Sequence, residues 1–227
     1  VALGYNTQAD GLYSIAMGNQ SRASGGSSVA MGYGAFSGGL RSVAIGSGTT
    51  SGENSFSAFG VANGLNSVAI GSSAISNGDY AVALGHELSS ETFGQTTIGY
   101  NNTSAFGDAN AAVATDRLFV IGNGTRAVKS DALTVLKNGN MTIAGSLTTA
   151  GATYPDYVFE NYLEGSSNID KTYTFKSLTE VESFIKANKH LPGVTGINEL
   201  KKTKNGYEIN LTKLSTQTLE KVEELYL

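Results

Sequence analysis

Few residues of this 227-residue chain could carry out acid–base, nucleophilic or metal chemistry. The two histidines, His86 and His190, lie far apart in the sequence, in segments of different composition. The chain has no cysteine, so thiolate nucleophiles, disulfides and the sulfur ligands of common zinc clusters are excluded. Neither the Gly-x-Ser-x-Gly elbow of hydrolases nor the Gly-x-x-x-x-Gly-Lys phosphate loop occurs. We therefore expect no catalytic residue, no cofactor and no metal site, and predict a protein that is not an enzyme.

Three tyrosines are the candidates for binding chemistry. Tyr5, Tyr33 and Tyr100 each follow a glycine, where an exposed aromatic ring could stack on a sugar or on a partner protein. The simpler interpretation is that these rings cover the edges of the fold. Gly25-Gly26 and Gly38-Gly39 are similar to calcium-binding nonapeptide repeats, but the aspartate that such repeats need two or three positions later is missing. Ligand-facing tyrosines therefore remain the one binding hypothesis for this part of the chain.

An internal repeat in the sequence predicts the secondary-structure elements on which these side chains lie. A glycine recurs every fourteen residues from Gly4 to Gly60 and, after one step of eleven, again from Gly71 to Gly99; most of these glycines close an apolar–Ala–apolar segment. Fourteen residues are too few for a helix–turn–helix repeat but enough for two short strands and two tight turns. Each cycle is therefore expected to form one flattened coil, and the coils are expected to stack as a parallel β-roll.

The alternation of side chains along a strand divides each coil into two faces. Val43 and Ile45 share one face, and we assign this column, with Val68 and Ile70, to the core of the roll. The alanines between them would then form a flat outer face on which another copy of the chain could pack. The alternative is that alanine merely fits a strand, although strands are depleted in alanine. The predicted interface residues are Ala16, Ala30, Ala44, Ala69 and Ala83.

The eleven-residue step marks an irregular coil. The segment from Gly60 to Gly64 lacks three of the usual seven residues between glycines, whereas Gly64 to Gly71 keeps all seven. We therefore predict that the deletion lies in one half-coil, as a tightened turn. The strand at 68–70 should then keep register with the strand at 43–45.

The composition favours an exposed fibre. The first 113 residues hold 20 of the 29 glycines, no proline, and two cations against six acids, a net charge of −4. This acidity argues against nucleic acid and anionic membranes as partners. No stretch is long and apolar enough for direct insertion into a membrane, and we expect none of these residues to act as a signal peptide. Because the chain starts inside a repeat at Val1, we interpret it as part of a longer protein.

The repeat resembles a known family. Its centre, Ser-Val-Ala-Ile-Gly at 67–71, followed by Ala/Ser and a second glycine, is similar to the head of trimeric autotransporter adhesins of the YadA-like type, over residues 1–107. The resemblance implies a left-handed parallel β-roll in a homotrimer. The handedness follows from the resemblance alone, because general chirality rules favour right-handed crossovers.

From residue 108 the period ends, and residues 108–153 are expected to form a β-rich neck. The segments 118–121 and 132–136 read as strands, and Asn138-Gly139 is a strong signal for a hairpin turn into a strand at 141–143. Two segments of the neck, with the sequences RLFVIGNGT and ALTVLKNGNMTIAG, are similar to segments of bacterial surface-fibre and phage tail-fibre proteins. The neck is therefore expected to precede a C-terminal assembly region.

Residues 154–211 are expected to form a small α+β unit. Ser177 and Glu180 form a capping box that opens an amphipathic helix, which continues to about Asn188 before His190-Leu191-Pro192-Gly193 ends it. The alternating segment 207–211 is predicted to be a strand. About 58 residues can hold only a small core, so this unit is expected to depend on its neighbours.

Residues 212–227 are predicted to begin a coiled-coil helix. Leu214, Thr218, Val222 and Leu225 follow one another at spacings of four, four and three residues. Together with the segment at 177–193, this tail resembles the end region of fibre proteins from Gram-negative bacteria, which sometimes precedes an intramolecular chaperone.

These features predict a mainly β, non-enzymatic, homotrimeric extracellular fibre that attaches to a surface or receptor through many weak contacts. The expected partners are further copies of the chain and a host, surface or glycan receptor that the sequence does not name. The first alternative is a receptor-binding tail fibre of a phage or contractile injection system. The second is the stalk of a fibre with a self-cleaving C-terminal chaperone. The expected location is the bacterial cell surface, or the tip of a phage-like particle.

Overall fold

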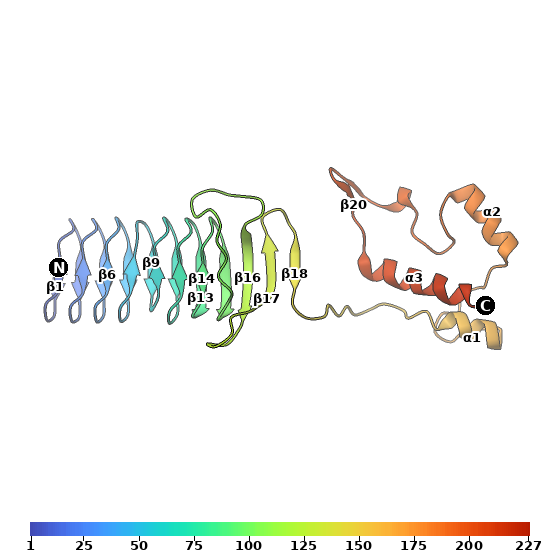
Figure 1. The fold of residues 1–227 in the computed structure, drawn as a ribbon, viewed down its shortest axis with the longest axis horizontal. Coiled ribbons are helices and arrows are strands. Elements are labelled where there is room, and N and C mark those ends of the chain that lie inside the picture. The colour runs from blue at the N-terminus through green and yellow to red at the C-terminus, as the bar shows by residue number, and fades with distance from the viewer. The chain divides into compact units, whose positions relative to one another are not determined.

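A computed structural model describes residues 1–227 as two compact units, Val1–Ser146 and Leu147–Leu227. The N-terminal unit is a β-roll of stacked coils with three further strands at its end (Figure 1). The C-terminal unit is mainly helical. The two units are described separately below.

The strands of the N-terminal unit belong to two sheets. Sheet A has eleven strands, in the order β1 (Ala2–Leu3), β3 (Ile15–Met17), β5 (Val29–Met31), β7 (Val43–Ile45), β9 (Phe56–Ala58), β11 (Val68–Ile70), β13 (Val82–His86), β15 (Thr96–Tyr100), β16 (Arg117–Asn123), β17 (Asp131–Leu136) and β18 (Met141–Ile143). Sheet B has seven, β2 (Gln8–Ala9), β4 (Arg22–Ala23), β6 (Phe36–Ser37), β8 (Thr50–Ser51), β10 (Val61–Ala62), β12 (Ile75–Ser76) and β14 (Ser89–Ser90).

Parallel pairing between successive coils confirms the predicted roll. Ala16 pairs with Ala30 in sheet A, and Gln8 pairs with Arg22 in sheet B, each fourteen residues apart. Backbone amides also bond from each coil to the previous one, as Gly18 N does to the Leu3 carbonyl at 2.9 Å. Each coil therefore satisfies the backbone hydrogen bonds of the previous one.

A glycine follows most sheet A strands of the roll, where the chain turns toward sheet B. Gly32 has a φ of +135°, and a Cβ atom built on it would lie 2.3 Å from the carbonyl oxygen of Gly46 in the next coil. Both the backbone conformation and the close approach of the next coil exclude a side chain. The glycine that recurs every fourteen residues thus allows successive coils to approach one another closely enough to stack.

The assignment of the core from the sequence was wrong. The five alanines predicted to line a subunit interface, Ala16, Ala30, Ala44, Ala69 and Ala83, are completely buried inside the single chain. Val43, Ile45 and Val68 are half-buried on the outside of the roll, and Ile70 is 40% exposed. The valine and isoleucine columns therefore face outward and the alanine column faces inward.

The reason is the narrow space between the two sheets. Each coil sends four small side chains inward, as Ser28, Ala30, Ala35 and Ser37 do, and all four are fully buried. Strands of two or three residues joined by tight turns leave no room for valine or isoleucine between the sheets. Some buried hydroxyls bond to nearby carbonyls, as Ser28 Oγ does to the Gly25 carbonyl at 2.6 Å, whereas others, such as those of Ser21 and Ser67, have no partner within the chain.

The irregular coil lies around β9 and does not interrupt the stack. Val43 pairs with Phe56 thirteen residues on, and Phe56 pairs with Val68 twelve residues on. The missing residues are thus divided between the turns before and after β9, so the prediction of a deletion in one half-coil was wrong. Phe59, with a φ of +59°, takes the place of the strand-ending glycine. The predicted register between 43–45 and 68–70 is kept through β9.

The three strands predicted beyond the roll are present and belong to the same sheet. β16 pairs in parallel with β15, so that Ile121 lies beside Ile98. β17 and β18 then pair antiparallel, with Leu133 opposite both Ile121 and Ile143. The backbone ladder of the roll therefore continues into the neck.

The C-terminal unit contains three α-helices, a 3₁₀ turn and a two-stranded hairpin. Its elements are α1 (Tyr157–Glu164), α2 (Leu178–Asn188), η1 (Ile197–Glu199), β19 (Lys202–Thr203), β20 (Gly206–Tyr207) and α3 (Leu211–Leu225).

The structure confirms the helix that was predicted from its capping box and revises the segments on either side. Ser177 accepts a hydrogen bond from the amide of Glu180, as expected at the start of α2. α1 was not predicted from the sequence. The predicted strand at 207–211 was wrong, because Asn210 caps α3, accepting a bond from the Lys213 amide at 2.9 Å, and α3 begins at Leu211.

Candidate functional site

The outward face of sheet A is the most distinctive surface of the N-terminal unit. Two columns of side chains run along it from coil to coil and contain no charged residue, and we call them the apolar face. The first column is Ile15, Val29, Val43, Phe56, Val68 and Val82, and the second is Met17, Met31, Ile45, Ala58, Ile70 and Leu84.

The residues of the apolar face are exposed to a similar degree along the roll. Ile15 and Met31 are each 37% exposed, Leu84 is 39% and Ile70 is 40%. Isolated exposed apolar side chains are normal on a protein, but a continuous uncharged face marks an interaction surface. The arrangement is suited to packing against a second flat apolar surface.

The opposite face of the roll, on sheet B, has a different character. One outward residue per coil forms a mixed column there, beginning with Gln8 and Arg22 and continuing through Phe36 and Thr50. Arg22 forms an exposed ion pair with Asp10 at 3.1 Å. The continuous apolar columns are therefore confined to sheet A.

The three candidate ligand-facing tyrosines are exposed but do not form one cluster. Tyr5 is 75% exposed, Tyr33 is 60% and Tyr100 is 52%. Asn19 occupies the equivalent position on the coil between Tyr5 and Tyr33. Tyr100 ends β15, several coils further along, beside His86 of β13. The structure therefore offers three separate aromatic contact points at turns.

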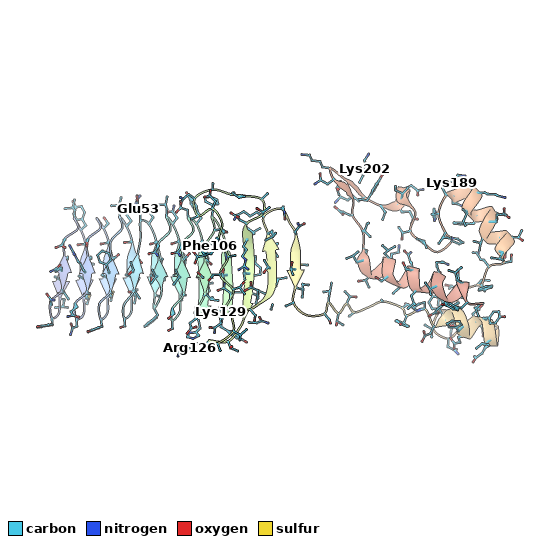
Figure 2. All side chains as sticks on the ribbon, in the orientation of Figure 1. Glu53, Phe106, Arg126, Lys129, Lys189 and Lys202 are labelled. Carbon is cyan, nitrogen blue, oxygen red and sulfur yellow. The ribbon has the colours of Figure 1, made fainter.

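An ion-pair cluster that sequence reasoning missed joins the roll to the neck. Lys129 Nζ lies 3.0 Å from Glu87 Oε2 and donates to Asn101 Oδ1 at 2.8 Å. The hydrogen bond from Lys129 is the main cause that holds the pKa of Glu87 below its ordinary value. Figure 2 shows Lys129 with Arg126 at one edge of the roll, while Glu53 lies at the other edge. Glu87 and Lys129 are 42 residues apart, so no local pattern could predict their contact.

A second polar cluster fixes the start of the neck. Arg117 lies 3.0 Å from Asp131, and both side chains are largely buried. Arg117 Nη1 also donates to the Thr103 carbonyl at 2.6 Å, and the Thr103 amide donates to Asp131 Oδ1 at 2.9 Å. This network closes the long connection between β15 and β16, and its groups bond to one another.

The two histidines lie in separate surroundings. No group of three or more His, Cys, Asp or Glu side chains could hold a metal ion. His86 lies beside Glu87 at 3.6 Å, and His190 packs edge-on against Phe184 in the C-terminal unit. Separately, none of the helices is both long and apolar enough to span a membrane.

An apolar hollow of about 380 Å³ lies in the C-terminal unit. Its apolar lining includes Phe175, Leu178, Val181, Leu191 and Leu225, and its charged lining consists of Lys176, Lys221 and Glu224. Lys221 and Glu224 bond to each other at 2.8 Å.

Part of the roll is similar to a known family. Residues 1–21, 23–49 and 62–87 match the family model described as the YadA head domain repeat. The unmatched stretch between the last two segments contains β9 and the irregular turns. The neck and the C-terminal unit lie outside the matched residues. No curated protein matches the chain.

Proposed function

We propose that the roll, of which residues 1–21, 23–49 and 62–87 match the YadA head repeat, is a YadA-like head, and that the chain assembles as a homotrimer and serves as an extracellular adhesin fibre. The head is an adhesin-type structural domain. The trimer, the attachment function and the location at the bacterial surface are the parts of the proposal that go beyond the family match.

The apolar face carries the proposal. Inside most coils the buried side chains are alanine, serine and threonine, which contribute little hydrophobic free energy; Leu88 is the large apolar side chain that is fully buried there. Ordering the backbone costs about 1–2 kcal/mol per residue, so a lone thin roll is poorly stabilised. Full burial of an exposed large apolar side chain contributes about 1.5–3 kcal/mol, so packing these partly buried valine, isoleucine and methionine columns against other copies would contribute a fraction of that for each side chain. Assembly therefore supplies the hydrophobic core that the single roll lacks.

Attachment is assigned to the turns and to sheet B, which remain accessible when the apolar face is covered. Tyr5, Tyr33 and Tyr100 project from separate turns and would contact a surface or glycan receptor one at a time. Three chains with repeated coils convert such weak contacts into strong binding through multivalency. No observation on this chain favours the tail-fibre or chaperone-stalk alternatives, which share this architecture.

A charge on the apolar face tests the assembly. Ile45→Asp places a carboxylate in the proposed interface, and sedimentation should show loss of the trimer because an unpaired buried charge is costly. Thr50→Asp, on the outer face of sheet B, is the matched control and should sediment as the unchanged chain does. A variant Ile45→Asp that stays trimeric would place the interface elsewhere.

Adhesion of beads coated with the chain tests the function. Beads carrying the unchanged chain should bind to polystyrene or to immobilised glycans about 10²–10⁴ times more strongly than beads carrying Ile45→Asp at equal density. Equal adhesion by the two would contradict a multivalent mechanism. Absence of adhesion by the trimeric chain on every surface would contradict the adhesin function itself.

A further inference from the structure

We propose that the side chains of Lys129 and Asn101 react with each other to form an amide bond within one chain, with Glu87 carrying the protons. The product is a covalent cross-link between the end of β15 and the loop that joins β16 to β17. The proposal depends only on contacts inside a single chain, so it stands or falls independently of the proposed trimer. The ion pair between Lys129 and Glu87 is the arrangement before the reaction.

Three side chains from three separate segments meet at this point. Lys129 Nζ donates to Asn101 Oδ1 at 2.8 Å and lies 3.0 Å from Glu87 Oε2. Because a carbonyl bond is about 1.2 Å long, Nζ lies at most about 4 Å from the amide carbon, Asn101 Cγ. Reacting atoms in productive complexes are about 3–3.5 Å apart, so a small rotation of these side chains closes the remaining distance.

The backbone next to each reacting side chain is anchored. The amide of Asn101 donates to the His86 carbonyl at 3.0 Å, which places Asn101 beside the reacting carboxylate. The carbonyl of Asn101 accepts from the Ser130 amide at 3.1 Å, which places it beside Lys129. A Cβ atom built on Gly124 would lie 2.3 Å from the Asn101 carbonyl oxygen, so glycine is needed for the loop to approach this closely. The fold therefore holds the amine and the amide together before they react.

The surroundings suit the attack of an amine on an amide. Asn101 is only 5% exposed, which shields its amide from water. The side chain of Lys129 is 42% exposed and that of Glu87 is 22% exposed, so the released ammonia has a path to solvent. His86 and Arg126 lie 3.6 Å and 3.9 Å from Glu87. These basic groups favour the ionised carboxylate, which is the form that accepts a proton.

The reaction exchanges one amide nitrogen for another. Only a neutral amine attacks a carbonyl carbon, so the Glu87 carboxylate first takes a proton from Lys129 Nζ. Nζ then forms a bond with Asn101 Cγ, and the bond between Cγ and Nδ2 breaks. Glu87 passes two of the Nζ protons in turn to Nδ2, which leaves as ammonium. No electron acceptor is needed, and the chain becomes lighter by one NH₃, about 17 Da.

The cross-link would fasten the neck to the roll. Asn101 and Lys129 are 28 residues apart, and the segment between them contains β16 and the long connection that precedes it. A covalent bond between the ends of a segment restricts the unfolded chain, as a disulfide does. Local unfolding of β16 would then leave the loop attached to the last coil.

The mass of the intact, denatured chain tests the proposal. The unchanged chain should weigh about 17 Da less than its sequence, and a tryptic digest should contain the peptides of Asn101 and Lys129 joined to each other. Lys129→Arg keeps the positive charge but not the reacting amine, so this variant should have the full mass of its sequence. Lys204→Arg is the matched control, because Lys204 is exposed in the C-terminal unit, and it should remain about 17 Da light.

Two further variants test the reacting groups. In Glu87→Gln, followed from freshly synthesised chain, the linked form should appear about 10²–10⁴ times more slowly, because the proton carrier is missing. Asn101→Asp should lose water, about 18 Da, in place of ammonia, because the leaving group is then an oxygen. This variant keeps the test decisive if Lys129→Arg does not fold.

Circular dichroism of each variant shows whether the roll is folded. A folded, unchanged chain that has the full mass of its sequence overturns the proposal. A loss of ammonia that persists in Lys129→Arg also overturns it, because the loss then arises at another residue. Linkage of Glu87→Gln at the unchanged rate overturns the proton transfer assigned to Glu87.

Discussion

At the scale of residues, the roll depends on small side chains inside and large apolar ones outside. Replacing Ala44 with leucine should force three extra carbon atoms into a space in which Ala44 is completely buried. We expect a loss of about 1–3 kcal/mol, because overpacked interiors must shift backbone or adopt strained rotamers. Unfolding of the head in urea, followed by circular dichroism, measures this loss.

Thr50→Leu is the matched control for Ala44→Leu, because Thr50 points outward from sheet B. The free energy of unfolding of Thr50→Leu, obtained from the same urea titration, should differ from that of the unchanged chain by less than about 0.5 kcal/mol. If Ala44→Leu unfolds at the same urea concentration as the unchanged chain, the interior assigned to alanine and serine is wrong.

Glu223 is the residue at which pH should act on the C-terminal unit. Burial is the main cause that raises the pKa of Glu223, and the carboxylates of Asp156 and Glu220 raise it further. The folded unit therefore binds this proton more tightly than the unfolded chain does. The proton on Glu223 therefore stabilises the folded unit when the pH is below the pKa of glutamate in the unfolded chain. This stabilisation is lost as the pH rises from that pKa through the raised pKa of Glu223 in the folded unit.

Glu223→Gln should consequently raise the melting temperature near neutral pH and leave it unchanged below about pH 3.5, where the glutamate is protonated in both states. The exposed Glu164→Gln is the control and should have no effect at either pH. A melting temperature that Glu223→Gln lowers near neutral pH would show that the ionised carboxylate stabilises the unit.

At the scale of elements, the sequence predicted the coils well but could not show which face of a strand is inward. Strict alternation establishes that Val43 and Ile45 share a face opposite Ala44. It does not say which face points between the sheets, and the rule that large apolar residues lie inside fails when the sheets are this close. The recurrence of small residues at four positions per cycle was the signal that could have corrected it.

Other elements could not be predicted because distant contacts decide them. The position of the shortened turns around β9 depends on pairing with both neighbouring coils. The start of α1 depends on Tyr157, which is held by α3, 63 residues further along the chain. By contrast, the capping box of α2 and the hairpin turn before β18 are local signals, and both were read correctly.

The loop between β16 and β17 should depend on one ion pair. Lys129 holds the pKa of Glu87 below its ordinary value. The contribution of this contact to stability is therefore fully present when the pH is above the ordinary pKa of a glutamate. It is lost as the pH falls through the lowered pKa of Glu87 and the carboxylate becomes protonated. Glu87→Gln removes the charge at neutral pH. We expect faster hydrogen exchange at the amide of Ser130, which bonds the Asn101 carbonyl at 3.1 Å.

Arg126→Ala is the control for that loop, because Arg126 is 92% exposed and lies 3.9 Å from Glu87. Exposed pairs at such distances contribute little. Exchange in the first coils should be unchanged in both variants. Slow exchange at Ser130 in Glu87→Gln would show that the Arg117 network holds the loop without Lys129.

At the scale of the whole molecule, two surfaces remain apolar in a single chain. One is the face of sheet A in the head, and the other is the side of α3 that carries Leu211, Leu214, Val222 and Leu225. The proposed trimer would cover the face of sheet A with further copies of the chain.

The native mass of the intact 23.5 kDa chain tests this account most directly. Native mass spectrometry, checked by sedimentation equilibrium at micromolar concentration, should show a species of three chains with no substantial monomer, because the apolar face supplies the missing core only in the assembly. A folded, stable monomer with the apolar face exposed at these concentrations would contradict the account.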